Sequence, residues 1–419
     1  NFEGPKHYRY ERIYCRGEAN CVIYQDSAME GSGSDVDTSP YGLRSHAAAA
    51  GIKRGLLTFR NRCTLVSASR MRLQRACSGV QVWGGKDIVL SDILVRDMNT
   101  DDAQTSQQAI GEILAGQRIG GVITTGSGVL AWAEFAHGLS VVNLSAEHVR
   151  MPANTLNHCW GYLHDTYSAS YTNIAFINKG LVPTGATYAA GVVLSDFAGT
   201  LTGVEIQGLN YGLRTEGTIV STQINNAHID GAPGTVAAAV IPLQMDHALS
   251  AGLRVDGIHL SSYNEMARWG ASFADYNADI RGLKVDGGVV PFSRVIPAFN
   301  NSGVAFSSLD LAALDATSPA GTCRVANPAL GANLLPCIIV SGLPFDGGTG
   351  FLLVAPAPLS SGVVRCDAAA VAVGDLIAHS AATVRRGTQN NLALAYQACG
   401  RALRLKAAGA EGNVPIGPA

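Results

Sequence analysis

Charged residues are scarce in this chain of 419 residues: Asp, Glu, Lys and Arg together make up 15% of it, and the formal net charge is −2. Proteins that bind nucleic acid present a basic surface, and this near-neutral balance provides none. The sequence has no run of eighteen apolar residues, which argues against a membrane-spanning segment. We therefore expect a protein that neither binds nucleic acid nor spans a membrane.

Motifs for metals and nucleotides are missing as well. The nine cysteines form no CxxC or Cys/His pattern of the kind that binds zinc. We expect free, buried thiols, with small loops closed by Cys15 and Cys21 or by Cys323 and Cys337 as the alternative. No Walker, Gly-x-Gly-x-x-Gly or Gly-x-Ser-x-Gly motif stands in its proper context. We expect no metal and no cofactor.

A short phrase does recur, five times between Gly161 and Gly287: an acidic residue ends a largely apolar run, and an alternating segment follows. The acids stand 31, 20, 30 and 29 residues apart, and they are Asp165, Asp196, Glu216, Asp246 and Asp275. A period of about 20–50 residues is typical of a solenoid, in which each repeat buries its apolar face against its neighbours.

The alternating segments indicate β-strands with one buried face, because apolar residues occupy every second position. Each segment closes on Gly or Asn, which favours a sharp turn: Ile174–Asn178, Val204–Gly208, Ala227–Gly231, Leu253–Gly257 and Leu283–Gly287. Helical repeats would need longer stretches with a period of 3.6 residues, and these are missing. The sequence therefore predicts an all-β fold, a parallel β-helix.

Weaker copies of the phrase and changes in composition divide the chain. We expect an N-terminal cap and first coils at 1–78, the β-helix at 79–310, a linker at 311–335 and a small C-terminal β domain at 336–419. Asp26–Ala50 and Asn99–His137 interrupt the spacing, and we expect both to form loops, because insertions in solenoids often form a binding face. Asp35 and Asp37 in the first loop could hold a cation, but their spacing differs from that of a calcium loop.

The coil phrases resemble the right-handed parallel β-helix superfamily, which includes pectate-lyase-like enzymes and bacteriophage tailspikes. Separately, three segments are similar to small β-modules of phage head-decoration and fibre proteins: Val371–Ile377, Ala398–Leu403 and Gly412–Ile416. Together these resemblances imply a homotrimeric phage virion protein, located on the particle or otherwise extracellular. Its partners would be a bacterial surface polysaccharide and other virion proteins.

The acids of the repeat are the candidate catalytic residues. Stacked coils lie about 4.8 Å apart, so acids in one register would form a vertical line. Two carboxylates about 5–5.5 Å or about 6.5–9.5 Å apart suit retaining or inverting glycosidases, respectively. We name four as candidates, Asp165, Asp196, Glu216 and Asp246. The alternative is that each acid caps a turn by accepting hydrogen bonds from the backbone.

Residues near these acids are candidates for binding a saccharide. Tyr167 and Tyr276 each follow an expected strand end, where an aromatic face can stack on a sugar ring. Aromatic side chains inside the solenoid core are the alternative. Arg214 is a candidate to bind a uronic carboxylate, as a polysaccharide lyase would require.

Three functions are compatible with this sequence. The first is a phage spike that binds, and as an enzyme would depolymerise, a bacterial surface polysaccharide. The second is a non-enzymatic head-decoration or fibre protein. The third is a secreted bacterial polysaccharide lyase. Whether the protein is an enzyme is left open by the sequence.

Overall fold

The computed structural model is built from strands, and no helix occurs among the residues that it describes. Across those residues, no segment forms a helix that could cross a membrane. The described residues are 2–3, 7–17, 23–26, 29–40, 55–74, 78–96, 113–115, 136–148, 158–178, 189–209, 211–231, 241–263, 267–269, 278–285, 291–300, 306–307, 309–315, 324–326, 335–341, 350–356, 362–379, 387–389 and 398–417. The chain forms two compact units, which are described separately: Asn1–Ala251 with Ser261–Asn264, and Gly252–Leu260 with Glu265–Ala419.

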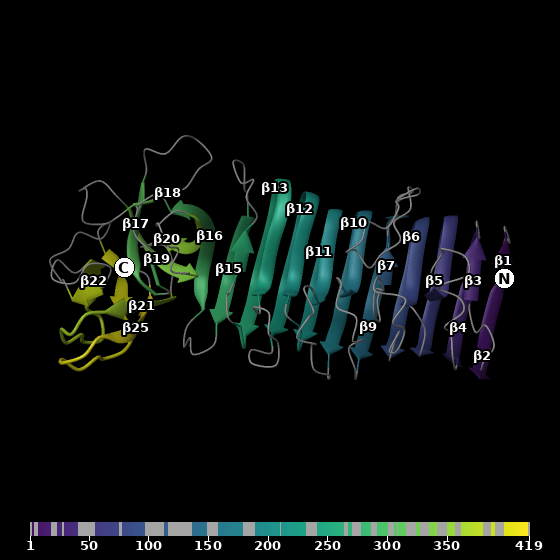
Figure 1. The fold of residues 1–419 in the computed structure, drawn as a ribbon, viewed down its shortest axis with the longest axis horizontal. Helices are drawn as coiled ribbons and strands as arrows, with labels where there is room; N and C mark the ends of the chain where they lie inside the picture. The colour runs from purple at the N-terminus through teal and green to yellow at the C-terminus, as the bar shows by residue number, and fades with distance from the viewer. Residues whose placement is uncertain are drawn as a thin grey trace. The chain divides into compact units, whose positions relative to one another are not determined.

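Unit 1 is a parallel β-helix, as the sequence predicted. Figure 1 shows its strands following one another side by side. Every strand pair identified in this unit is parallel, from β1 with β3 and β2 with β4 onward, and the register shifts within the β5–β6, β10–β11 and β11–β12 pairs. Its strands are β1 (Phe2–Glu3), β2 (Arg9–Gly17), β3 (Ile23–Asp26), β4 (Ser32–Pro40), β5 (Gly55–Gln74), β6 (Ser78–Arg96), β7 (Ile113–Ala115), β8 (Ala136–His137), β9 (Ser140–His148), β10 (His158–Asn178), β11 (Ala189–Gln207), β12 (Tyr211–Asp230) and most of β13 (Ile241–Ser261).

The solenoid begins earlier than the sequence indicated. Ser32–Pro40, which we expected to be part of a flexible loop, is strand β4 and pairs with both β2 and β5. Gly31 and Gly33 make this possible, because a Cβ at either position would lie 2.0 Å from the ring of Tyr8 or Tyr10. Residues 27–28 and 41–50 of the first expected loop and most of Asn99–His137, apart from β7 and β8, lie outside the described residues.

Coils of unit 1 bend at two corners, which lie five residues apart in most of them. At both corners a residue adopts the left-handed conformation with positive φ, which costs energy for residues other than Gly, Asn and Asp. The first corner comprises His7, Glu30, Leu65, Asp87, Gly138, Ser168 and Ser221, while β11 is one residue shorter at this point and has no residue with positive φ there. The second comprises Arg12, Asp35, Arg70, Asp92, Asn143, Asn173, Gly203 and Asn226. The strand registers stack successive second-corner residues on one another.

The corners reset the alternation of buried and outward side chains. Leu139, just before β9, and Val141 within it precede the second corner, Leu144 and Ala146 follow it, and all four are at most 2% exposed. Buried positions are thus separated by two, three and two residues rather than by two throughout. The interior is filled by such aliphatic residues and by large rings, among them Phe59, Tyr171 and Phe197.

Unit 2 begins with parallel strands and continues as a mixed sheet. The end of β13 pairs in parallel with β15, whereas β16 pairs with β15 in the antiparallel sense, so the stack of parallel coils ends at β15. In the sheet that follows, β16 pairs with β20 in the antiparallel sense and with β18 in parallel. This sheet contains part of the predicted linker, because β17 and β18 pair with each other. The strands are β14 (Ala267–Trp269), β15 (Ala278–Val285), β16 (Phe292–Asn300), β17 (Leu311–Asp315), β18 (Arg324–Ala326), β19 (Leu335–Ser341) and β20 (Gly350–Pro356).

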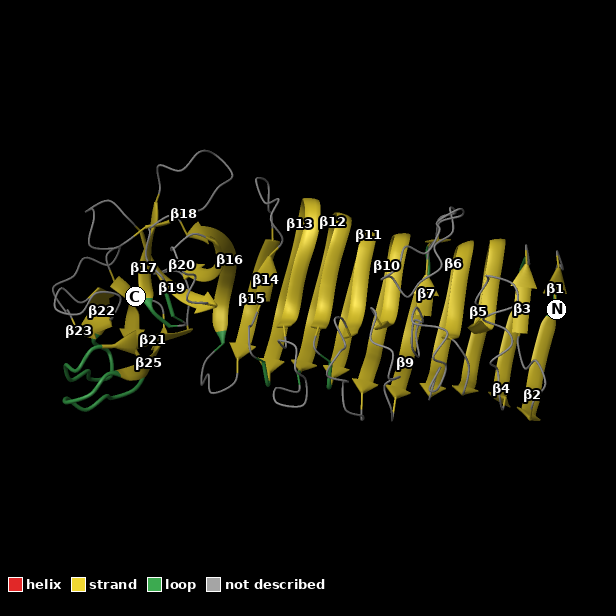
Figure 2. Ribbon diagram, in the orientation of Figure 1, coloured by secondary structure: helices red, strands yellow, loops and turns green. Residues whose placement is uncertain are grey.

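The last five strands of unit 2 close into a small barrel in the order β21–β23–β22–β24–β25. They are β21 (Gly362–Cys366), β22 (Leu376–His379), β23 (Gly387–Gln389), β24 (Ala398–Ala402) and β25 (Gly412–Gly417). The sequence predicted a small C-terminal β domain, and the barrel lies within its bounds. Figure 2 shows described loops, in green, beside β25.

One pair of repeats was aligned wrongly from the sequence. The phrases beginning at Leu253 and Leu283 were treated as equivalent, but Leu253 pairs with Ala278. Leu283 follows Gly282, which has positive φ, just as Ile258 follows Gly257. The two phrases therefore lie on opposite sides of a corner. The sequence does not reveal this difference, because the strand segments before and after the corner have the same alternation of apolar and polar residues.

Candidate saccharide-binding faces of the solenoid

The segment between the two corners presents a nearly uncharged outer surface. Its outward residues form two columns across seven coils, named here the hydroxyl face. The columns are Ser32, Ser67, Val89, Ser140, Ser170, Thr200 and Gln223, and Ser34, Ser69, Ser91, Val142, Thr172, Thr202 and Asn225. Each of these side chains is half-buried or exposed, while the intervening residues point into the core.

The hydroxyl face is a lattice of hydrogen-bonding groups with fixed spacing. Neighbouring coils place equivalent side chains about 4.8 Å apart, and the two columns lie about 6.7 Å apart along the strand. Hydroxyl and amide groups both donate and accept hydrogen bonds. Asn225 already donates through Nδ2 to Thr202 Oγ1, at 3.4 Å. Because the strands are rigid, a ligand bound here would not need to order the protein.

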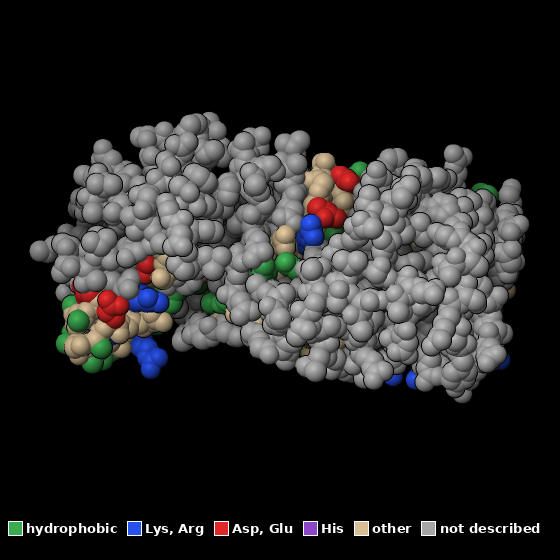
Figure 3. Space-filling view, in the orientation of Figure 1, with side chains coloured by type: hydrophobic (Ala, Val, Ile, Leu, Met, Phe, Trp, Pro, Cys, Tyr) green, Lys and Arg blue, Asp and Glu red, His purple; other side chains and the backbone are tan. Residues whose placement is uncertain are grey.

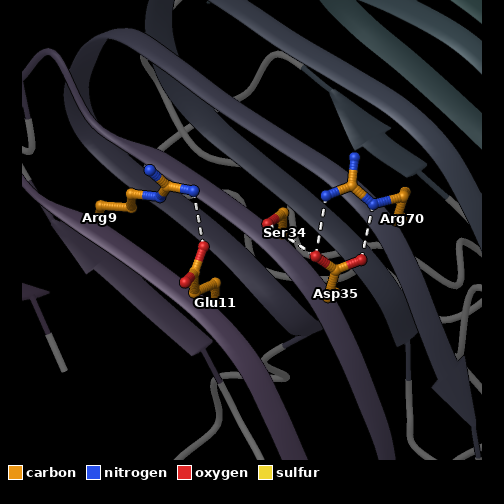
Figure 4. A network of polar contacts seen from close by, with 5 residues as sticks. All are labelled: Arg9, Glu11, Ser34, Asp35 and Arg70. Carbon is orange, nitrogen blue, oxygen red and sulfur yellow. Dashed lines mark hydrogen bonds and ion pairs between the residues drawn. The ribbon is translucent and has the colours of Figure 1, made fainter.

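Charges border this face at its N-terminal end and along the second corner. In the coil that precedes Ser32, Arg9 Nη2 donates to Glu11 Oε2 at 2.6 Å, and Figure 4 shows this pair near the corner contact of Asp35 with Arg70. Arg70 donates to both oxygens of Asp35, at 2.6 and 2.8 Å. These hydrogen bonds lower the pKa of Asp35 to about 2, so its carboxylate stays ionised and engaged by Arg70. This contact leaves Asp35 poorly placed to hold a cation.

Further along the solenoid, polar side chains of the second corner form hydrogen bonds between neighbouring coils. Asn143 Nδ2 donates to Asp92 Oδ1 at 2.8 Å, and Asn173 Nδ2 donates to Asn143 Oδ1 at 3.2 Å. A Cβ at Gly203, the next residue in the column, would lie 2.9 Å from Asn173 Oδ1. Side-chain hydrogen bonds between coils thus support the strained conformation of this corner.

The segment after the second corner carries the charges and is named here the charged face. Its outward residues include Arg96 and Glu147, whose Nη2 and Oε2 atoms lie 3.3 Å apart. Further along, Glu205 stands in register with His228, and Gln207 with Asp230. Gln207 Nε2 donates to Glu205 Oε1 at 2.5 Å. All four of these later side chains are half-buried.

The predicted vertical line of acids is wrong for Glu216. Its register partner on β11 is Ser195, not Asp196. Asp196 instead occupies a turn with positive φ, and its Oδ1 accepts the N–H of Thr218 in the next coil at 2.9 Å. Asp196 therefore caps a turn, which was the alternative interpretation. Gly217 provides the room, since a Cβ there would lie 2.7 Å from the Asp196 carboxylate.

The other predicted site residues are dispersed. Glu216 is ion-paired with Arg214 on the same strand, with Oε2 and Nη2 3.3 Å apart. Tyr167 is half-buried and stands directly before the first-corner residue Ser168. The backbone of Asp165 lies opposite Asp196, and Asp246 belongs to β13, but both side chains fall outside the described part of the chain. Asp275 and Tyr276 lie wholly outside it.

Sequence reasoning missed the hydroxyl face although a signal for it exists. Ser or Thr recurs at the second and fourth positions of the five-residue unit, as in Val66-Ser67-Ala68-Ser69 and Ala169-Ser170-Tyr171-Thr172. Acids and aromatic residues stand out as candidate site residues in the sequence, whereas these serines and threonines look like ordinary strand residues.

Three of the nine cysteines fall among the residues whose thiols are described, and all three are free and buried: Cys63, Cys337 and Cys366. This confirms the expectation of free thiols for these positions, and it excludes a loop closed by Cys323 and Cys337. Burial raises the pKa of the Cys366 thiol to about 12. Such a thiol is a poor nucleophile because it stays protonated. Among the residues with described side chains, no group of His, Cys, Asp and Glu could hold a metal ion.

Comparisons with known proteins give no family assignment. No family model matches the sequence, and no curated protein matches it. Among solved structures it is similar to tailspike gp49 of Acinetobacter baumannii bacteriophage Fri1, a capsular polysaccharide depolymerase, with 10% identity and a TM-score of 0.27, over 80% of this chain and 62% of that one. For the Pseudomonas phage phi297 tailspike gp61 the identity is 10% and the TM-score 0.23, over 80% and 64%. For the fluoroquinolone resistance protein QnrB1 the values are 10% and 0.14, over 68% and 92%.

The chain thus spans less than two thirds of the length of either tailspike. At TM-scores below 0.5 these likenesses carry no argument about a site or an activity. The β-helix itself rests on the strand registers of this chain, and it is the fold that the sequence resemblance implied.

Proposed function

We propose that this protein is a bacteriophage spike component that binds a bacterial surface polysaccharide along its solenoid. One observation carries the proposal: the hydroxyl face, two uncharged columns that run from Ser32 and Ser34 to Gln223 and Asn225 and are polar at every position except Val89 and Val142. A polysaccharide is an extended polymer whose hydroxyl groups repeat. A surface of hydroxyl groups that repeat at a fixed spacing is complementary to such a ligand.

The strength of binding would come from repetition. A single hydrogen bond between neutral groups contributes about 0.5–1.5 kcal/mol net. Once one part of the glycan is bound, its neighbouring sugar units are already close to the next coils. Several weak contacts along the rigid surface therefore strengthen binding together. The phage assignment is supported by the solenoid and by the sequence resemblance stated above.

Cleavage is a further part of this proposal, and it requires the bound chain to cross the second corner onto the charged face. The charged face places Glu205 diagonally from Asp230 on the next coil, about 8 Å apart at Cα from strand spacing and rise. Carboxyl groups carried by backbones at this separation can reach the roughly 6.5–9.5 Å that the inverting mechanism uses, with a water molecule between them. The earlier assignment of Asp165, Asp196, Glu216 and Asp246 stays a prediction, with Asp196 and Glu216 already engaged by Thr218 and Arg214.

Binding is tested with immobilised capsular and lipopolysaccharide glycans from a panel of bacteria, measured by biolayer interferometry. Ser140→Arg places a long cation on the hydroxyl face and should weaken binding at least tenfold. Ser145→Arg is the matched control, because Ser145 is an equally half-buried serine on the charged face of the same strand. Failure of the wild-type chain to bind any glycan would refute the proposed function. If only Ser145→Arg loses binding, the glycan binds the charged face and the assignment to the hydroxyl face is wrong.

Cleavage is tested separately, by reducing-sugar release and by the absorbance of unsaturated products. Glu205→Gln and Asp230→Asn should each lower the rate at least 100-fold while leaving glycan affinity within threefold. Glu216→Gln and Asp196→Asn are assayed in the same way, because they test the assignment made from the sequence. If only the second pair loses activity, the Glu205–Asp230 assignment is wrong.

A further inference from the structure

An exposed leucine occupies a strained position at the first corner of the solenoid. Leu65, on β5, has a φ of 55° and is 53% exposed. Asn, Asp or Gly adopts this conformation at lower cost, and a polar side chain would be better solvated there. The fold therefore does not require a leucine at this position, and a strained residue at the surface points to a functional reason.

Leu65 begins a line of apolar side chains that crosses the hydroxyl face obliquely. Val89 is in register with Ser67, which lies two residues after Leu65. Val142 is in register with Ser91, which lies two residues after Val89. Each step thus moves one coil along the solenoid and one outward position along the strand, about 8 Å between Cα atoms. Val89 is 45% exposed and Val142 is half-buried, and they are the two apolar members of the hydroxyl face.

The same line leads to the proposed cleavage pair. Continued by one outward position per coil, it passes Asn173 at the second corner of β10 and reaches Glu205 on β11 and Asp230 on β12. One oblique step therefore relates three aliphatic side chains, one corner residue and two acids on successive coils. The line is named here the oblique track, and its members are Leu65, Val89, Val142, Asn173, Glu205 and Asp230.

A glycan that follows this track must cross the second corner, and Gly203 leaves a gap there. Gly203 stacks on Asn173 and lies two residues before Glu205. In the other described coils of unit 1 the second-corner residue carries a side chain: Arg12, Asp35, Arg70, Asp92, Asn143, Asn173 and Asn226. Asn173 Oδ1 faces the gap, because it would lie 2.9 Å from a Cβ at Gly203. Asn173 Nδ2 already donates to Asn143, so Oδ1 is the atom that can accept a hydroxyl group from a crossing sugar.

The aliphatic section of the track favours sugars that carry methyl groups. Leu and Val have no flat ring on which a sugar could stack, but they bury a methyl group favourably. Leu65 is flanked at its corner by Glu30 and Asp87, whose carboxylates disfavour an anionic sugar. In the two largest coloured groups of Figure 3, blue side chains lie beside red ones, so neither group presents cations alone. The track is therefore suited to select a glycan by its methyl groups rather than by charge.

We infer that the bound polysaccharide lies along the oblique track, with the methyl groups of deoxy or N-acetylated sugars on Leu65, Val89 and Val142. The glycan crosses the second corner over Gly203 and arrives between Glu205 and Asp230. This inference rests on the proposed function and adds to it the direction of the bound chain and the class of sugar. It also accounts for how one glycan contacts both the hydroxyl face and the charged face.

The aliphatic contacts are tested with the glycan that the wild-type chain binds best. Leu65→Asn should lower the affinity at least threefold and still fold, because Asn tolerates a positive φ. Val89→Thr should have a similar effect, since Thr keeps the shape of Val but replaces one methyl group by a hydroxyl. Val373→Thr is the matched control, because Val373 is 66% exposed on the C-terminal barrel; it should bind as the wild type does. Circular dichroism checks that each variant folds.

Chemical de-N-acetylation of the bound glycan distinguishes the two sources of methyl groups. If the affinity falls, re-N-acetylation should restore it, and N-formylation, which adds no methyl group, should not. If the affinity is unchanged, the methyl groups belong to deoxy sugars, which must then be present in the glycan. Equal restoration by N-formylation would overturn the methyl assignment, as would a bound glycan that contains neither kind of sugar.

The crossing is tested by closing the gap. Gly203→Asn restores a side chain of the kind found at the neighbouring corners Asn173 and Asn226, and it is introduced into Glu205→Gln so that the glycan is not consumed. Affinity is measured for oligosaccharides of increasing length, and the Gly203→Asn chain should stop gaining affinity at a shorter length than its parent. Gly138→Asn is the control, because Gly138 is a first-corner glycine with a φ of 68° that lies off the track; it should behave as the parent does.

The outcomes separate this inference from the proposed function. The same length dependence in Gly203→Asn and its parent would refute the crossing, and unchanged binding by Leu65→Asn and Val89→Thr would refute the aliphatic contacts. In either case the wild type still binds glycan, so the proposed function would stand. A wild-type chain that binds no glycan would refute both together.

Discussion

Replacing Tyr171 by Phe should make the solenoid more stable. Tyr171 is 2% exposed in the interior of β10, and its ring lies against Phe197 with the centroids 6.4 Å apart. Its hydroxyl oxygen is buried and has no hydrogen-bond partner among the residues that the structure describes. A buried polar group without a partner costs about 1–3 kcal/mol, whereas Phe would keep the ring contacts. We expect Tyr171→Phe to stabilise unit 1 by roughly 1 kcal/mol.

The same side chain makes a prediction about pH. Burial raises the pKa of the Tyr171 phenol above its ordinary value of 10.0. Above pH 10 the unfolded chain loses this proton while the folded chain retains it, so stability falls as pH rises. The loss approaches about 1.4 kcal/mol per pH unit for one group. Phe at this position removes that loss, so the advantage of the variant should widen from pH 9 to pH 11.

Urea unfolding followed by far-UV circular dichroism at pH 8, 9, 10 and 11 measures both effects. Tyr14→Phe is the control, because Tyr14 is 72% exposed and its removal should change little. If Tyr171→Phe lowers the midpoint at pH 8 by the equivalent of 1 kcal/mol, a buried water satisfies the hydroxyl and the reasoning fails. A stability difference that stays constant with pH would refute the titration argument alone.

Three further perturbations test the corners and the first coils. Gly33→Ala should destabilise the N-terminal coils by about 1–3 kcal/mol, since its Cβ would collide with Tyr10, and Tyr10→Leu should relieve the loss in urea unfolding. Asn173→Gly should be nearly neutral in thermal unfolding, whereas Asn173→Val should cost about 1–3 kcal/mol, because a β-branched residue is strained at positive φ. Arg70→Gln should return the pKa of Asp35 from about 2 toward 3.8 in an NMR titration; in the wild type the stabilisation is present above pH 3.8 and is lost as pH falls through about 2. An unchanged Asp35 titration would show that Arg70 does not control it.

The architecture was predictable because solenoid repeats are visible in a single sequence. Alternating segments such as Val204–Gly208 end on a glycine with positive φ, and the structure places them on adjacent coils. What could not be predicted was the exact register. The left-handed corners are occupied by Arg12, Leu65 and Arg70 as well as by Asn and Gly, so residue type does not mark them. Stacking between coils imposes this conformation against local preference.

The candidate site was less predictable than the fold. The line of acids required Asp196 to align with Glu216, but the residue aligned with Glu216 is Ser195. Strand β4 was assigned to a loop because its glycines and serines favour turns locally. Its pairing depends on Tyr8 and Tyr10 in the preceding coil, which fill the space that Gly31 and Gly33 leave. Contacts between residues distant in sequence decided both cases.

The constant distance of five residues between the two corners has a consequence for how this chain can change in length. Successive second-corner residues are 23, 35, 22, 51, 30, 30 and 23 positions apart, yet the first corner lies five residues before the second wherever it has a residue with positive φ. The differences in coil length therefore lie almost entirely in the rest of each coil. Duplicating one short coil, such as 70–91, should lengthen the solenoid by about 4.8 Å and extend the hydroxyl columns by one row. The number of coils would then determine the length of the glycan segment that the protein binds.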